Sequence, residues 1–378
     1  PGGPARPRRA LPTGTAQCTA LLCVLLINAL VADNFFAIHI QDGRLFGSLI
    51  DILNRCAPVA LLSLGMTLVI ATGGIDLSVG AVMAISGATM ASLATGGHSL
   101  PVIFAAVIGV GLLCGLWNGL LVAVFKIQPI VATLILMVAG RGIAQLITEG
   151  QIITFNNEAL AWIGSGALFY LPTPVIITLG MALLLWLLTK RTALGLFIEA
   201  VGINIKAAKN AGLNTPMVVI ATYLLSGLMA AVAGMIIAAD IRGADANNAG
   251  LWLEMDAILA VVIGGTSLAG GRANILGTVV GALIMETLKK GLLMMGIAQE
   301  WQFVVTGIVV VIAVFVEVFN GVVGNYAMSW INNTFASAND EDDPDNPAPT
   351  SPLRSGGPGS LASWSSLGRQ GRIFVGNG

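Results

Sequence analysis

The densest group of polar side chains outside the two ends of the chain lies near residue 245. Asp240, Arg242, Asp245, Asn247 and Asn248 occur within nine residues. Carboxylate and amide oxygens accept hydrogen bonds, whereas guanidinium and amide nitrogens donate them. This mixture suits contact with the hydroxyl groups of a sugar or with the surface of another protein. A solvated loop without a binding role explains the same composition equally well.

A second informative segment, 197–214, is moderately polar and rich in small residues. Its alanines recur at helical spacing, between breaks at Gly202 and Gly212. A short helix with small side chains can dock closely into a groove on another protein, as a contact that transmits force requires. An interfacial helix that lies on a membrane has a similar composition. The residues alone do not decide between these interpretations.

The sequence lacks the common signatures of an enzyme. It contains no G-x-x-x-x-G-K-[ST] phosphate loop, so ATP hydrolysis by this chain is not expected. It has no paired carboxylates or Ser/His/Asp arrangement that would predict catalytic residues. Two distant histidines, His39 and His98, and four cysteines without a C-x-x-C pair predict no metal site and no cofactor. The net charge of −1 gives no sign of nucleic-acid binding.

The composition indicates that a lipid membrane surrounds much of the chain. Hydrophobic residues make up 56% and charged residues 10% of it, and the mean hydropathy is +0.87. Soluble domains carry about 25% charged residues, so we expect an all-α integral membrane protein. A span needs about 20 mostly apolar residues. The expected fold is a polytopic bundle of about ten transmembrane helices, near 18–32, 57–72, 77–95, 101–125, 129–148, 173–189, 216–240, 254–271, 274–295 and 301–320.

Composition also divides the chain into three parts. Residues 1–17 are rich in Pro, Arg and Gly and predict a basic, flexible tail. Residues 18–320 form the predicted membrane domain. The extension 321–378 loses the apolar pattern, carries an acidic run and is then rich in Ser, Gly and Pro, so we expect most of it to be disordered.

Asp76 stands out because it follows two glycines between two apolar runs. Only Gly73-Gly74-Ile75-Asp76 separates the predicted spans 57–72 and 77–95. Such breaks are tolerated where protein shields the backbone, so the pattern indicates a broken or re-entrant element near 73–77. Asp76 could line a gate or path. More simply, it could cap a helix that begins at Leu77, where a carboxylate favours the positive helix end.

Three further polar residues, Asn118, Arg141 and Gln145, lie in or near the fourth and fifth predicted spans. Arg141 and Gln145 are four residues apart and therefore share one helix face. Polar residues within spans suggest function by default, here hydrogen bonds to sugar hydroxyls along a water-filled path. Hydrogen bonding between helices is the simpler explanation, and Arg141 could also extend to the outer interface.

Basic residues predict the orientation, because they gather on the cytoplasmic side. The basic tail places the N-terminus there, and ten spans then make 190–215 a cytoplasmic loop as well. That loop carries four basic residues and one acid, Glu199, in agreement. Lys289 and Lys290 fit poorly, since they lie near the outer end of the ninth span. Glu286 precedes them by three and four residues and could pair with either.

Several motifs together resemble a known family. They are Ala71-Thr72-Gly73-Gly74-Ile75-Asp76-Leu77-Ser78-Val79-Gly80, Glu199-Ala200-x-Gly202 with Ala211-Gly212-x-Asn214, and Leu253-Glu254-Met255-Asp256-Ala257-Ile258 followed by Val262-Ile263-Gly264-Gly265-Thr266-Ser267. This set resembles the permeases of ABC importers of the ribose (simple sugar) type. Segments 41–47 and 240–250 look like the galactofuranose subfamily of enteric bacteria.

The resemblance implies a multi-subunit machine in a bacterial inner membrane. Its parts would be two permeases, possibly different from one another, an ATP-binding cassette subunit that holds ATP and Mg, and a periplasmic sugar-binding protein. Loop 190–215 would enter a cleft of the ATPase, and its coupling residues would be Glu199, Ala200, Gly202, Asn204, Ala208 and Gly212. Asp76, Asn118, Arg141 and Gln145 are the expected path or gate. The cluster from Asp240 to Asn248 is the expected site of docking or sugar access.

Other functions remain open. Within the same class, the cargo could be ribose, xylose or an autoinducer instead of galactofuranose. A stand-alone channel or ion-coupled secondary transporter is the main alternative class. That class usually carries ionisable residues within its spans and often has inverted repeats. Here the ionisable residues are few and mostly at span ends, and no repeat is evident.

Overall fold

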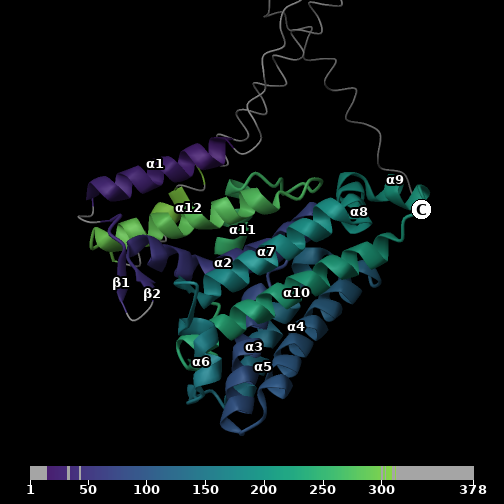
Figure 1. Ribbon diagram of the computed structural model, residues 1–378. Helices are drawn as coiled ribbons and strands as arrows, with labels where there is room; N and C mark the ends of the chain where they lie inside the picture. The colour runs from purple at the N-terminus through teal and green to yellow at the C-terminus, as the bar shows by residue number, and fades with distance from the viewer. Residues whose placement is uncertain are drawn as a thin grey trace, which may run out of the picture. The chain divides into compact units, whose positions relative to one another are not determined.

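A computed structural model describes residues 15–31, 35–41, 44–298, 301–302, 304–308 and 311. This part of the chain is mostly helical (Figure 1). Its helices are α1 (Thr15–Val31), α2 (Ser48–Ala71), α3 (Val79–Thr95), α4 (Leu100–Ala123), α5 (Pro129–Ile147), α6 (Glu158–Ser165), α7 (Thr173–Arg191), α8 (Ala193–Ile203), α9 (Ile205–Asn210), α10 (Thr215–Asp240), α11 (Leu253–Ile263) and α12 (Ile275–Met294).

Short strands join some of the connecting loops in antiparallel pairs. Strand β1 (His39–Gln41) pairs with β2 (Arg44–Phe46), and β4 (Ala167–Leu168) pairs with β5 (Leu171–Pro172). Strand β3 (Ile153–Thr154) pairs with the distant β6 (Gly243–Ala244) and so ties together the loops after α5 and α10.

Five helices of the described residues are long and apolar enough to cross a membrane, namely α2, α4, α5, α7 and α10. Helices α1 and α3 are apolar but shorter. A helical membrane fold is therefore confirmed, whereas the predicted count of ten is not. The predicted span 301–320 lies mostly outside the described residues, as do the tail 1–17 except its last residues and the extension 321–378.

Two predicted spans have different bounds in the structure. Helix α2 begins at Ser48, nine residues before the predicted start at 57. The polar residues Asp51, Asn54 and Arg55, which the prediction placed before the span, belong to its first turns. The predicted span 254–271 is wrong in length, since α11 ends at Ile263. Gly264 and Gly265 follow, and Gly265 has a left-handed φ of +82°, which stops the helix.

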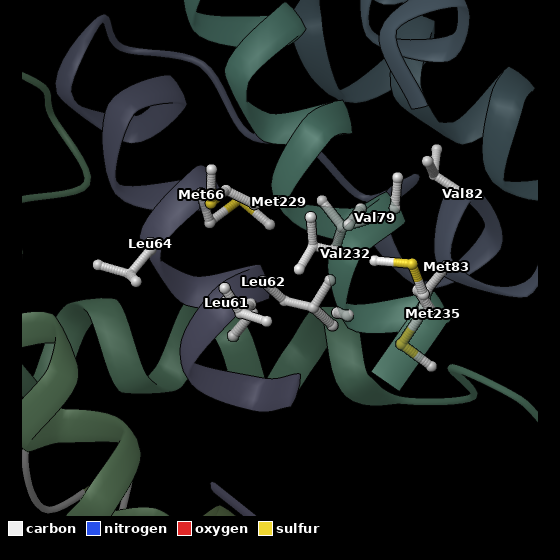
Figure 2. Close-up of a cluster of buried hydrophobic side chains, with 14 of the residues drawn as sticks. Leu61, Leu62, Leu64, Met66, Val79, Val82, Met83, Met229, Val232 and Met235 are labelled. Carbon is white, nitrogen blue, oxygen red and sulfur yellow. The ribbon is translucent and has the colours of Figure 1, made fainter. Parts of the chain in front are cut away.

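Helix α2 is the centre of the described bundle. Every residue from Cys56 to Ala71 is buried, as expected of a helix that is apolar on all sides. It packs against α7, α10, α11 and α12. Figure 2 shows side chains of α10 between those of α2 and those of α3. The labelled residues of this cluster are Leu61, Leu62, Leu64, Met66, Val79, Val82, Met83, Met229, Val232 and Met235.

The outer faces of α4 and α5 are apolar and exposed. Leu113, Trp117, Val138 and Leu146 expose more than half of their surface, and Leu146 exposes 80%. Such a surface is unfavourable in water over two adjacent helices but natural against lipid tails. These faces are therefore expected to contact the bilayer.

Helices α4 and α10 approach closely because glycines face each other across their contact. A β-carbon at Gly111 would collide with Ala231 and the carbonyl of Gly227, and one at Gly115 would overlap the carbonyl oxygen of Tyr223. Small residues allow this close backbone packing, which drives helix association in membranes. The contact positions α10, whose other faces meet α2 and α3.

Two glycines on α4 give a test of this packing. We expect Gly115→Ala to destabilise the protein by about 1–3 kcal/mol, because the methyl group has no room. Gly109→Ala, at a position where a β-carbon meets no atom within 4 Å, should be neutral or stabilising by roughly 0.5–1 kcal/mol. Thermal unfolding of the two purified variants in detergent measures the difference. Equal melting temperatures would contradict the close α4–α10 contact.

Candidate functional site

The first group of candidate residues lies on α8 and α9, at the end of the bundle where α2 finishes (Figure 1). The two short helices are separated by Asn204, whose side chain accepts the backbone N–H groups of Lys206 and Ala207, each at 3.0 Å. Gly212 has φ +87° and ends α9, while the N–H of Leu213 donates to Ala208 at 3.1 Å. Asn204 and Gly212 thus have clear structural roles as helix caps.

Gly202 fixes α8 against the end of α2. A β-carbon there would overlap the carbonyl oxygen of Ala71 and lie 2.6 Å from the nitrogen of Gly271. The N–H of Gly271 in turn donates to Ala71 at 2.9 Å. Three segments far apart in sequence therefore meet at one point. Of the three, only the segment 190–215 was predicted to lie on the cytoplasmic side.

The remaining surface of α8 and α9 is suited to contact with another protein. Leu196 and Ile203 are 68% and 75% exposed, and Ile205 is also exposed. Glu199 is half-buried, with its carboxylate 4.0 Å from Nζ of Lys190. Ala200 is partly buried and Ala208 is buried. Exposed apolar residues beside a partly free carboxylate are typical of a docking surface.

The second group surrounds Asp76 at the break between α2 and α3. The carboxylate is buried and accepts hydrogen bonds from the hydroxyl of Ser78 at 2.6 Å, the N–H of Ser78 at 3.0 Å and the hydroxyl of Ser226 at 2.8 Å. The amide of Asn118 donates to Ser78 at 2.8 Å and reaches Asp76 at 3.5 Å. This network joins the break to α4 and α10.

These contacts modify the prediction for Asp76. The break lies where the sequence indicated, but α3 begins at Val79 and not at Leu77, and its N-cap residue is Ser78. Asp76 does not cap the helix in the ordinary way. It instead holds Ser78 and cross-links two further helices, because a buried carboxylate needs several donors to remain stable. Asn118 belongs to the same network.

Arg141 and Gln145, predicted with Asp76 and Asn118, lie in a different network. The guanidinium of Arg141 donates to the carbonyls of Ala246 and Ala249, and the amide of Gln145 donates to Asn247 at 2.9 Å. Both side chains therefore hold the loop after α10 onto α5. The predicted hydrogen bonding between helices is thus not what these side chains do, because their acceptors lie in a loop.

The predicted polar cluster 240–248 is divided in the structure. Asp245 accepts the amide of Asn248 at 2.7 Å and the N–H of Asn247 at 3.1 Å. The hydrogen bond from the Asn248 side chain is the main reason that the pKa of Asp245 is lowered. Asn247 also donates to Gly150 at 3.4 Å. These three residues thus stabilise the loop itself.

The other two members of that cluster are exposed. Arg242 adopts a left-handed φ of +52°, and its side chain has no hydrogen bond or ion pair within the described residues. Asp240, at the end of α10, lines a cleft together with Asp51 and Asn54 of α2. The structure therefore separates Asp240 from its sequence neighbours.

A charged cluster that the sequence analysis did not assemble lies beside this cleft. Asp51 bonds to Arg55 at 3.0 Å and to Lys290, while Lys289 bonds to Asp256. The predicted pairing of Glu286 with Lys289 or Lys290 is wrong, because both lysines extend to carboxylates on neighbouring helices. Two features of the sequence could have indicated this cluster. Charged residues lie three and four positions apart in 274–295, and Asp51 and Arg55 lie four positions apart. No group of three potential metal-ligating side chains occurs in the described chain.

We expect Asp76→Ala to lower the free energy of unfolding by about 3 kcal/mol or more, because three buried donors would lose their acceptor at about 1–3 kcal/mol each. Ser226→Ala removes a single hydrogen bond and should cost less, about 1–2 kcal/mol. Thermal unfolding in detergent compares the two. A stable Asp76→Ala protein that no longer transports would instead identify Asp76 as part of a gate.

Comparison with known proteins extends this description. The family model described as "Branched-chain amino acid transport system / permease component" matches residues 48–314. The galactofuranose transporter permease protein YtfT of Escherichia coli (strain K12) is 66% identical over 306 residues, which are 81% of this chain and 90% of that protein. No solved structure matches the chain.

Other relatives are permeases named for different sugars. The fructose import permease protein FruF of Bifidobacterium longum (strain NCC 2705) is 38% identical, over 76% of this chain and 82% of the relative. The ribose import permease protein RbsC of Escherichia coli (strain K12) is also 38% identical, over 79% and 91%. The family match covers the described helices from α2 onward. The chain therefore belongs to the permease-component family of branched-chain amino acid transport systems, within the branch that resembles ribose-type sugar permeases.

Proposed function

We propose that this chain is the membrane-spanning permease of an ATP-driven importer of a monosaccharide, with galactofuranose as the first choice of cargo. The observation that carries the proposal is the 66% identity to a galactofuranose transporter permease across 90% of that protein. Identity to ribose and fructose permeases is much lower, at 38%.

The geometry supports a role as a transport subunit that depends on a partner. Helices α8 and α9 expose apolar side chains at one end of the bundle, next to the end of α2. A partner that binds there can move α2 directly, because Gly202 leaves no space between the two segments. The sequence has no phosphate loop, so the energy would come from that partner.

The proposed complex contains four kinds of component. An ATP-binding cassette subunit binds ATP and Mg and contacts α8 and α9. A second, homologous permease, identical or different, completes the path, and a periplasmic binding protein delivers the sugar. The complex lies in a bacterial inner membrane and involves no nucleic acid. Docking of the binding protein is assigned to the exposed surface that includes Arg242 and Asn248.

A permease for another sugar is the runner-up within this class, with ribose, xylose and fructose as the cargo to test. A stand-alone channel or secondary transporter is the other class. The charged residues in the structure bear on that choice. Asp51, Arg55, Lys289 and Lys290 occupy one end of their helices and are paired, whereas ion coupling needs titratable groups along the path.

Reconstitution in liposomes tests the proposal. ATP hydrolysis by a candidate cassette ATPase should rise only when this permease, its second permease and a galactofuranose-loaded binding protein are all present. Stimulation by a binding protein loaded with ribose or fructose would change the cargo and keep the class. Sugar flux through this chain alone, without ATP, would favour a channel or secondary transporter.

Variants of α8 test the coupling contact. We expect Glu199→Ala to abolish the stimulated ATP hydrolysis in a folded complex, and Gly202→Ala to do so by displacing α8 from α2. Glu158→Ala and Gly180→Ala are matched controls, because Glu158 is exposed on α6 and a β-carbon at Gly180 meets nothing within 4 Å. Unchanged stimulation in a folded Glu199→Ala complex would refute the role of Glu199. Lys190→Ala removes the ion pair between Lys190 and Glu199 but keeps the Glu199 carboxylate. This variant therefore distinguishes a contact of Glu199 with the partner from its ion pair within this chain.

A further inference from the structure

Helices α2, α10 and α12 form most of the wall of a polar cleft at the end of the bundle opposite α8 and α9. Its central part has a volume of about 570 Å³ and is lined by Asp51, Asn54, Arg55, Asp240, Glu286 and Lys289. Hollows of about 320 Å³ and 390 Å³ share residues with it on either side. Small-molecule sites commonly measure about 300–1,000 Å³, so a monosaccharide fits.

The basic side chains in and beside the cleft are all paired with carboxylates. Asp51 bridges Arg55 and Lys290, and Lys289 bonds to Asp256. These pairs tie α2 to α12 and α11 to α12. Ionised side chains on membrane helices are costly unless they are paired and face a cavity or the bundle interior. A wet cleft is therefore the environment in which this cluster is stable.

Three polar residues in the cleft keep hydrogen-bonding capacity that the protein does not use. Glu286 and Asp240 have no hydrogen bond or ion pair among the described residues, and the side-chain oxygen of Asn54 is buried without a partner. A buried polar atom such as the Asn54 oxygen usually has a partner, in the protein, in water or in a ligand. The half-buried Glu286 and the exposed Asp240 offer further acceptors to the same cleft. Carboxylates and an amide accept and donate to hydroxyl groups.

We propose that this cleft, with Asn54, Asp240 and Glu286 as the contacting side chains, binds the sugar on its way through the permease. The inference rests on the proposed function and adds the place and the residues. The near balance of acidic and basic groups suits a neutral polyhydroxyl molecule and disfavours an anion. Asp76 and Asn118, by contrast, have their bonding capacity taken up within the protein, apart from one oxygen of Asn118.

The first experiment measures sugar flux in liposomes that contain the complete complex and the loaded binding protein. Glu286→Gln should reduce flux at least about tenfold, as the loss of one hydrogen bond to a charged acceptor predicts. Glu158→Gln, which removes an exposed carboxylate on α6 outside the cleft, should transport normally. Wild-type flux in Glu286→Gln would count against the cleft.

The second experiment reports binding independently of transport. Asp240→Cys, with the four native cysteines replaced by alanine, should react with a membrane-impermeant maleimide, and a methyl galactofuranoside should slow the reaction. Glu158→Cys should react without protection. Absence of protection at position 240, together with normal flux in Glu286→Gln, would overturn this proposal and leave the proposed function intact. Absence of sugar flux in the wild-type complex would overturn both.

Discussion

The complete burial of the second half of α2 is the constraint on which the other contacts depend. From Cys56 to Ala71 the helix has no exposed face, so its neighbours must cover it on every side. Apolar side chains supply this packing along most of its length, and glycines supply it where backbones touch. Because interiors are close-packed, a displacement of α2 cannot be absorbed locally. It must be passed to α7, α10, α11 or α12.

Polar groups occur where this packing is interrupted. At the break after Ala71, Asp76 and its donors replace apolar contacts with hydrogen bonds. At the opposite end, Asp51 and Arg55 emerge from the packed region into a cleft. In the loop after α10, Arg141 of α5 donates to backbone carbonyls and Gln145 of α5 donates to the side chain of Asn247. Each polar group is explained by its position relative to the apolar core.

Local patterns were predictable from the sequence, and long-range pairings were not. The break near 73–77, the apolar spans and the break at Gly212 follow from nearest neighbours and composition. The predicted break at Gly202 is wrong, because this residue lies inside α8 and the helix ends before Asn204. The start of α2 was misplaced because the partner of Asp51 on α12 is 239 residues away. Arg141 could not be assigned, since its acceptors are backbone carbonyls, which leave no signature in the side chains. Likewise, no local rule relates Gly202 to Ala71.

One residue of α2 separates its two halves. Pro58 lies inside the helix, and proline has no amide hydrogen, so the carbonyl of Asn54 cannot receive the usual bond from the next turn. The fourteen residues from Pro58 to Ala71 form a rod of about 20 Å. Its far end is held by α8, and its near end meets the segment that carries Asp51 and Arg55. The helix therefore connects the contact with α8 at Ala71 to the wall of the cleft, and the turn that lacks a hydrogen bond lies at that wall.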